Sequence, residues 1–231
     1  MARIGLRLLG GFLLRADGRP RPLPARKAQA LLAYLAVRGG RAHAREALTA
    51  LFWADAGERQ ARQSLRQIMV RLRRALAGSR RALVVQGDTV TLHPTALDVD
   101  VATFERLLRR GTPEALEAAV ALYQGPLLDG VHVVAPGFEE WLESERARLA
   151  ELALDALRRL MDHHLKRGRP EAAAQAATRL LALDPVQEDA HRTLMRLHAQ
   201  AGRRATALRQ YQTCVALLQK ELGVEPEAST R

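Results

Sequence analysis

The stretch QSLRQIMVRLRRAL, residues 63–76, decides the fold of the first part of this chain. At 100° per residue, its apolar side chains Leu65, Met69, Leu72 and Leu76 fall on one side of a helix. The stretch therefore predicts an amphipathic helix that buries this side against a core.

The opposite side of that helix lacks carboxylates. A surface helix that needs only solubility usually mixes acids and bases, because opposite charges four residues apart support each other. Here no Asp or Glu occurs between Arg59 and Arg81. We expect the helix to run from about Glu58 to Ala77, with Gly78 as its stop.

Gln and Arg on that side indicate a nucleic-acid partner. Both make paired hydrogen bonds to adenine and guanine edges, whereas a carboxylate would be repelled by phosphate. The candidate base-reading residues are Gln63, Gln67, Arg71 and Arg74, with Val70 on the same side. The candidate phosphate contacts are Arg62, Ser64, Arg66, Arg73 and Lys27. The helix thus predicts double-stranded DNA as a partner.

Two other interpretations of this side stay open. Arg far outnumbers Lys in the chain, so an arginine-rich solvated face is one alternative. RNA is the other, although the aromatic platforms that single-stranded RNA binders use are missing from this segment.

The residues before this helix predict short strands and a first helix. Residues 3–14, beginning with Arg3, combine alternating polar and apolar side chains with short apolar runs, and an Asp17-Gly18 turn follows. This pattern is typical of small antiparallel strands. Three prolines then forbid helix, and a helical period begins at Arg26 and ends at Gly39-Gly40.

A second short helix should run from about residue 43 to 51 and bury Ala47, Leu48 and Leu51. Beyond the third helix, residues 83–92 place two β-branched arms around Gly87-Asp88, which predicts a hairpin.

Strands, three helices and a hairpin wing make a winged helix, a helix-turn-helix variant, over residues 1–94. Charge supports a division there: residues 1–92 hold 18 Lys and Arg against 5 Asp and Glu, while residues 93–231 hold 18 against 20. The first module should meet a polyanion and the second something else.

Residues 95–231 predict an all-α domain. Asp100 is a candidate N-cap for a helix carrying Phe104, Thr112-Pro113 starts another that reaches about Tyr123, and residues 138–167 form one long helix. In the long helix, Glu143 with Arg146 and Glu145 with Arg148 are i,i+3 pairs, which favour a solvated face.

An internal repeat closes the chain. Gly168-Arg169 recurs 34 residues later as Gly202-Arg203, and each Gly precedes an Ala by five residues, as in tetratricopeptide helix pairs. The alignment pairs Leu180 with Cys214, which predicts a buried thiol. Two repeats are few for a solenoid, so we expect the helices of residues 101–167 to complete one bundle with them.

Other classes of protein find little support. No apolar run suffices to span a membrane and no leader opens the chain, which favours a cytoplasmic, nucleoid-associated bacterial protein. The sequence offers no phosphate-binding glycine loop, no zinc-type His spacing and no Cys-His site. We therefore expect no enzyme, cofactor or metal.

The sequence resembles a known architecture, an OmpR-type winged helix followed by a bacterial transcriptional activator domain, as in SARP-type antibiotic regulatory activators. The motifs that carry the resemblance are Lys27–Leu35, Leu51–Trp53, Ala61–Leu65, Leu72–Leu76, Leu97–Asp100 with Phe104, Ala121–Leu128 and Glu221–Pro226. It implies binding to direct-repeat promoter sites as a dimer, activation through RNA polymerase, and a base-reading role for Arg71.

The loop before the third helix gives a second candidate site. In this fold class it can face RNA polymerase, and its candidate contacts are Trp53, Asp55 and Glu58. Trp53 has an alternative role as a core residue, because Phe52-Trp53 ends an apolar helix. Glu58 would also favour the N-terminus of the helix that follows.

We thus expect a DNA-binding transcriptional regulator whose helical half serves dimerisation or signal input. The alternative is a helical protein-binding scaffold with only non-specific affinity for nucleic acid.

Overall fold

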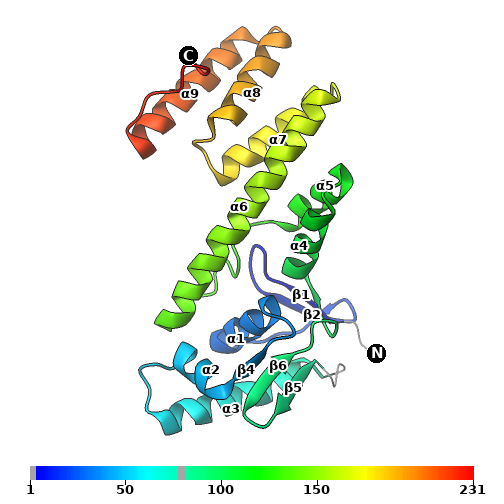
Figure 1. The fold of residues 1–231 in the computed structure, drawn as a ribbon, viewed down its shortest axis with the longest axis vertical. Coiled ribbons are helices and arrows are strands. Elements are labelled where there is room, and N and C mark those ends of the chain that lie inside the picture. The colour runs from blue at the N-terminus through cyan, green and yellow to red at the C-terminus, as the bar shows by residue number, and fades with distance from the viewer. Residues whose placement is uncertain (1–3, 78–81) are drawn as a thin grey trace. The chain divides into compact units, whose positions relative to one another are not determined.

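The computed structural model describes residues 4–77 and 82–231 (Figure 1). The predictions that involve Arg3, Gly78 and Arg81 concern residues that lie outside the described ranges. The chain divides into two compact units, one of Met1–Arg109 with Ala121–Leu149 and the other of Arg110–Val120 with Ala150–Arg231.

A four-stranded sheet opens the first unit. Its strands are β1 (Ile4–Arg7), β2 (Leu13–Ala16), β3 (Arg19–Pro20) and β7 (Asp98–Val99), in the order β3-β2-β1-β7. The antiparallel pairing of β1 with β2 confirms the predicted strands. β7 pairs parallel to β1 and was not predicted, because two residues are too few to show a period.

The helices and the hairpin follow in the expected order: α1 (Arg26–Val37), β4 (Ala42–Ala44), α2 (Arg45–Phe52), α3 (Glu58–Ala75), β5 (Leu83–Gln86) and β6 (Thr89–Leu92). α3 packs on α1 and α2. The predicted hairpin is confirmed, with β4 added as a third strand on the far side of β6.

The second helix differs from the prediction in two respects. It begins at Arg45, because residues 42–44 pair with β6 as a strand. Its buried side is formed by Leu48 and Phe52, one turn apart, whereas Ala47 is exposed and its predicted burial is wrong.

Aromatic side chains join residues 121–149 to the first unit. Tyr34 of α1 lies 4.7 Å from Trp141 of α6 (Pro136–Lys166), and Phe52 of α2 stacks on Phe138 at 4.9 Å, both measured between ring centroids. Aromatic pairs at these distances add to the free energy of burial. The start of α6 is therefore part of the core that supports the winged helix.

A buried carboxylate fixes the start of α4 (Asp100–Arg110). Oδ2 of Asp100 accepts hydrogen bonds from the amides of Leu8 (2.7 Å) and Leu9 (2.9 Å), and Oδ1 accepts from Val101 (2.8 Å). The predicted N-cap thus serves mainly the strand end of β1, 92 residues earlier. Burial raises the pKa of this carboxyl, although the three amides lower it.

A glycine contact lies beside this carboxylate. Gly10 adopts a φ of +89°, and a Cβ on it would lie 3.1 Å from Gln124. Its amide donates to the carbonyl of Pro126 at 3.1 Å, and Leu9 bridges to Leu127. Gly10 therefore serves close backbone approach, since a side chain would collide with the neighbouring segment.

The charged row of α6 only partly matches the prediction. The pairs Glu143–Arg146 and Glu145–Arg148 form, each at 2.8 Å. The face is nevertheless not merely solvated: Arg146 donates to the carbonyl of Leu127 at 2.9 Å, and Arg148 reaches Glu105 of α4 at 2.7 Å. Ion pairs that also bind other segments fix α6 against them.

The second unit holds the repeat. Its helices are α5 (Pro113–Leu122), the later part of α6, α7 (Pro170–Leu183), α8 (Glu188–Gln200) and α9 (Arg204–Leu222). Gly168 and Gly202 occupy equivalent turns with φ of +63° and +73°, and Leu180 and Cys214 are both fully buried, as the alignment predicts. The expectation that all helices of residues 101–167 join this bundle is wrong for α4 and the start of α6, which belong to the first unit.

We predict that Asp100→Ala lowers the free energy of unfolding by about 2 kcal/mol at pH 7, because three buried amides lose their acceptor. The raised pKa means that the folded state binds this proton more readily than the unfolded state. Wild-type stability conferred by Asp100 is therefore complete below pH 3.8 and declines as the pH rises through the raised value. Urea titrations of wild type and variant at pH 7 and pH 4 check this. A difference in unfolding free energy between the two proteins that is smaller at pH 4 than at pH 7 would contradict it.

We also predict that Cys214 is protected from thiol reagents. Burial raises the pKa of its thiol, so alkylation requires both exposure and deprotonation. Labelling by iodoacetamide at pH 8 should be at least about 100-fold slower in the folded protein than in urea. Equal rates in the two conditions would show that the repeat is not packed around this residue.

Candidate nucleic-acid interface

α3 buries one side as its sequence predicts. Leu65, Met69, Leu72 and Leu76 are all at most 6% exposed. Ala61, Ile68 and Ala75 widen the buried stripe. The amphipathic prediction is confirmed, and the orientation of the whole helix follows from it.

The other side of α3 gathers the predicted DNA-contacting residues. Those that are exposed are Arg62, Gln63, Arg66, Gln67, Val70, Arg71, Arg73 and Arg74, and Ser64 is half-buried. Glu58, at the start of the helix, is its only carboxylate, and it pairs with Arg62 at 2.5 Å. The rest of the exposed side offers donors and positive charge to a polyanion.

The C-terminal end of α3 is held by a residue that sequence reasoning missed. One guanidinium nitrogen of Arg21 donates to the carbonyls of Ala75 (2.9 Å) and Ala77 (2.7 Å). These carbonyls have no partner inside the helix, so a cation here satisfies them and suits the negative end of the helix dipole. Arg21 lies in a proline-rich segment 54 residues away, which no local pattern could connect to α3.

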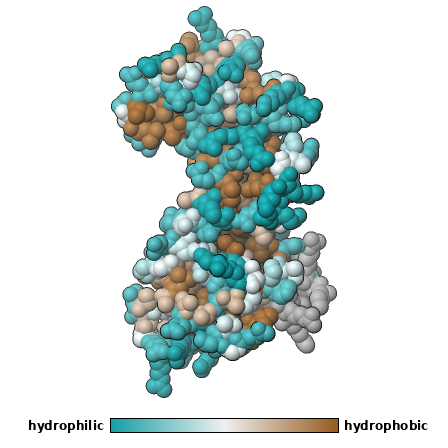
Figure 2. Space-filling model, viewed as in Figure 1, coloured by the Kyte–Doolittle hydropathy of each residue, from teal (hydrophilic) through white to brown (hydrophobic). Residues whose placement is uncertain are grey.

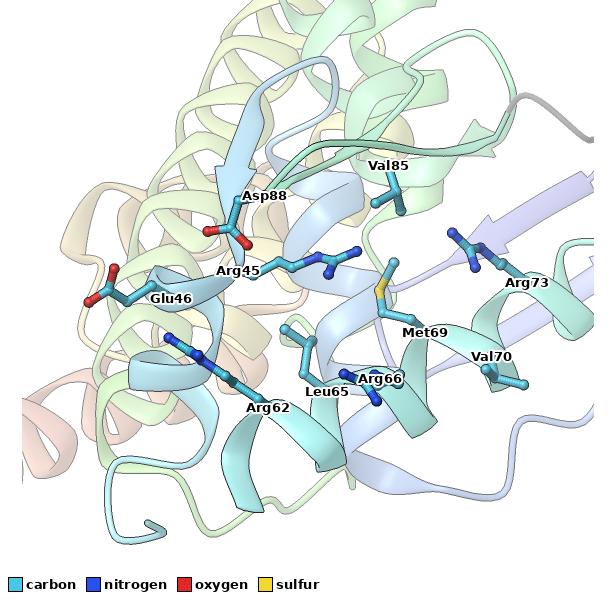
Figure 3. A pocket seen from close by; sticks show the side chains of 10 residues that line it. All are labelled: Arg45, Glu46, Arg62, Leu65, Arg66, Met69, Val70, Arg73, Val85 and Asp88. Carbon is cyan, nitrogen blue, oxygen red and sulfur yellow. The ribbon is translucent and has the colours of Figure 1, made fainter. Parts of the chain in front are cut away.

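Arg45 is a second missed residue, on the opposite flank of α3. It is the first residue of α2, and its amide donates to the carbonyl of Asp88 at 2.9 Å. Figure 3 shows its guanidinium directed into a hollow between α2, α3 and the hairpin, near Met69. The signal was available, since Arg45 is basic and begins a helix, but nothing local placed it beside α3.

The remaining predicted residues lie in or near the loop between α2 and α3. The ammonium of Lys27 donates to the carbonyl of Phe52 at 2.8 Å and lies 5.3 Å from the centre of the Trp53 ring. Its ammonium is therefore engaged inside the protein. Trp53 is half-buried against Phe52, and Asp55 is exposed.

Positive charge also marks the strand beside this region. Burial, and then the neighbouring Arg38 and Arg41, lower the pKa of His43 in β4. Within residues 4–77 and 82–231, no group of three or more His, Cys, Asp or Glu side chains is arranged to hold a metal ion. In the same residues, no helix combines the length and apolarity that a membrane span requires.

The fold and the exposed side of α3 define the class: a winged helix joined to tetratricopeptide-like helices, as in transcriptional regulators. Residues 99–231 match the bacterial transcriptional activator domain family. The chain belongs to this family, in which SARP-type regulators combine such a domain with a winged helix, and the family is a class of transcriptional regulators and not of enzymes.

Individual relatives agree. The chain is 30% identical over 229 residues to the regulatory protein AfsR of Streptomyces coelicolor, covering 95% of this chain and 22% of AfsR. It is 26% identical to the transcriptional regulatory protein MoaR1 of Mycobacterium tuberculosis, covering 97% of this chain and 76% of MoaR1. The chain thus spans about a fifth of the length of AfsR.

A solved structure confirms the fold class. Mycobacterium tuberculosis EmbR, in complex with a low-affinity phosphopeptide, matches the whole of this chain and 64% of its own, with a TM-score of 0.79 and 23% identity. The prediction of a mainly α protein with an N-terminal winged helix and a helical second part is confirmed.

We predict that Lys27→Met lowers stability more than it lowers DNA affinity. The variant loses the hydrogen bond to Phe52 and the contact with Trp53, which should cost about 1 kcal/mol of unfolding free energy. Affinity for duplex DNA should change by less than about twofold, because the ammonium is already engaged by the Phe52 carbonyl and the Trp53 ring. A loss of affinity without a loss of stability, measured by melting and by fluorescence anisotropy, would return Lys27 to the phosphate contacts.

Proposed function

We propose that this chain is a sequence-specific DNA-binding regulator, most simply an activator, whose helix α3 enters the major groove. The observation that carries the proposal is the exposed side of α3, which presents Gln and Arg and, beyond Glu58, no carboxylate. Recognition helices of winged-helix proteins use such a side to read base edges.

The residues divide by what they would touch. Gln63, Gln67, Arg71 and Arg74 are the proposed base-reading residues, with Val70 positioned for an apolar contact such as a thymine methyl. Arg62, Ser64, Arg66 and Arg73 are the proposed phosphate contacts, and backbone contacts of this kind set the register of the helix.

Two additions come from the structure. Arg45 would extend the phosphate contacts beyond α3, since its guanidinium lies between α3 and the hairpin. Arg21 would keep the end of α3 in place, near Arg71 and Arg74, with which it lines a shallow hollow of about 590 Å³. The first is a binding role and the second a positioning role.

The family suggests the remaining functions. We propose binding to direct-repeat promoter sites as a homodimer and recruitment of RNA polymerase in the bacterial cytoplasm, at the nucleoid. The loop residues Trp53, Asp55 and Glu58 are the proposed polymerase contacts; Asp55 and Glu58 are both exposed, and Glu58 also pairs with Arg62. The helical module, from residue 95 onward, is the proposed seat of dimerisation or signal input.

A protein-binding scaffold is the second candidate, and α9 favours it. Leu208 and Leu222 are 56% and 57% exposed, and Figure 2 shows apolar surface over this part of the second unit. Exposed apolar patches mark sites of protein contact. This activity is compatible with DNA binding, so only loss of sequence specificity would make it the main function.

We predict that Arg71→Ala reduces affinity for a site selected from a randomised duplex pool by about 1–3 kcal/mol and barely changes affinity for random duplex. Arg66→Ala should weaken both alike and reduce the slope of log K against log salt by about 1. Arg196→Ala, on the exposed surface of α8, is the matched control and should change neither.

The measurement is fluorescence anisotropy at several salt concentrations on the selected site and on a scrambled duplex. Equal losses on both duplexes for Arg71→Ala would move this residue to the phosphate contacts. If no site is enriched and the wild type binds every duplex alike, the sequence-specific function fails and the scaffold becomes the better proposal.

A further inference from the structure

The hollow beside α3 has features that DNA contact alone does not require. It encloses about 480 Å³ between the start of α2, one flank of α3 and the β5–β6 hairpin (Figure 3). Its volume lies in the range of pockets that bind small molecules. Its lining comprises Arg45, Glu46, Arg62, Leu65, Arg66, Met69, Val70, Arg73, Val85 and Asp88.

The floor of the hollow is apolar. Leu65 and Met69 are 3% and 6% exposed, so their side chains belong to the core and only their edges face the cavity. Val85 of β5 is half-buried and points into it from the hairpin, and Val70 completes the apolar side. A phosphodiester gains nothing from such a floor, whereas an apolar ligand gains free energy from every Å² it buries there.

The rim is cationic. Four arginines surround the hollow, and only Arg62 has an ion pair, with Glu58. In the part of the chain that the structure describes, Arg45, Arg66 and Arg73 form no ion pair. Guanidinium groups bind carboxylate, sulfonate or phosphate through paired hydrogen bonds. The carboxylates Glu46 and Asp88 lie on the α2 and hairpin side, so an anion would sit nearer to α3 (Figure 3).

We propose that this hollow binds a small amphipathic anion, an apolar body with one acidic group, and that the bound anion competes with DNA. The apolar body would rest on Met69 and Val85, and the acidic group would face Arg66 and Arg73. The competition rests on the proposed function, because these arginines are also the proposed phosphate contacts. A ligand of this kind would release the regulator from its operator without any change of fold.

The test uses the full chain and the fluorescent anion 8-anilinonaphthalene-1-sulfonate as the probe. Val85→Phe fills the floor and should weaken probe binding about tenfold. Affinity for duplex DNA should stay within about twofold, since Val85 is not itself one of the proposed phosphate or base contacts. Val85→Leu, a smaller increase in volume, should weaken probe binding by an intermediate factor, and it serves as the test if Val85→Phe does not fold. Thermal melting reports on the folding of both variants.

A second variant separates this hollow from other apolar surface. Leu222→Ser removes exposed apolar surface on α9, where the probe could also adhere. It should leave unchanged the part of the probe fluorescence that duplex DNA displaces. Duplex DNA should displace the probe from the wild type, with an apparent dissociation constant that rises in proportion to duplex concentration.

Each outcome bears on a different statement. Probe affinity that is the same in wild type, Val85→Phe and Val85→Leu overturns the proposed site. Simultaneous binding of probe and duplex overturns the competition but leaves the site. Absence of duplex binding in every protein, at low salt, overturns the proposed function and the competition with it, while the response to Val85→Phe still decides whether the hollow binds the anion.

Discussion

The first unit depends on a single buried carboxylate. Among the residues that the structure describes, Asp100 is the only acidic side chain that is buried, and it accepts hydrogen bonds from the amides of Leu8, Leu9 and Val101. A buried charge persists only where such partners compensate its loss of hydration. The carboxylate therefore determines where β1 ends and α4 begins, and β7, two residues long, is held beside β1 by the same contact.

That constraint explains why sequence modules and compact units do not coincide. The matched family begins at residue 99, whereas residues up to Arg109 and those of 121–149 pack with the winged helix. The aromatic pairs Tyr34–Trp141 and Phe52–Phe138 bury large side chains across this junction. An activator domain attached in this way cannot be removed at residue 94 without exposing Phe52, so truncation is a poor way to isolate DNA binding.

The sequence was sufficient where a pattern is local and repeated. The stripe of Leu65, Met69 and Leu72, the turn at Gly87-Asp88 and the 34-residue spacing of Gly168 and Gly202 each predicted its element. It was insufficient where one side chain joins distant segments. Arg21 reaches the end of α3 over 54 residues and Arg146 reaches the carbonyl of Leu127 over 19, while Arg45 lies beside α3. Only tertiary structure brings these partners together. The hydrogen bond of Lys27 was not predicted for the same reason, since its carbonyl partner lies in another helix.

The exposed side of α3 carries mutually repelling arginines, and other residues of the same helix reduce this repulsion. Like charges four residues apart, such as Arg62 and Arg66, destabilise a helix by about 0.2–0.5 kcal/mol each. Glu58 neutralises Arg62 across one turn, and Arg73 and Arg74 lie in the last turn, where cations favour the helix dipole. Among the residues that the structure describes, Arg66 has neither an ion pair nor a place in the last turn, and it lines the hollow. In the proposed competition, a phosphate group or a small acidic ligand beside Arg66 would relieve its repulsion with Arg62.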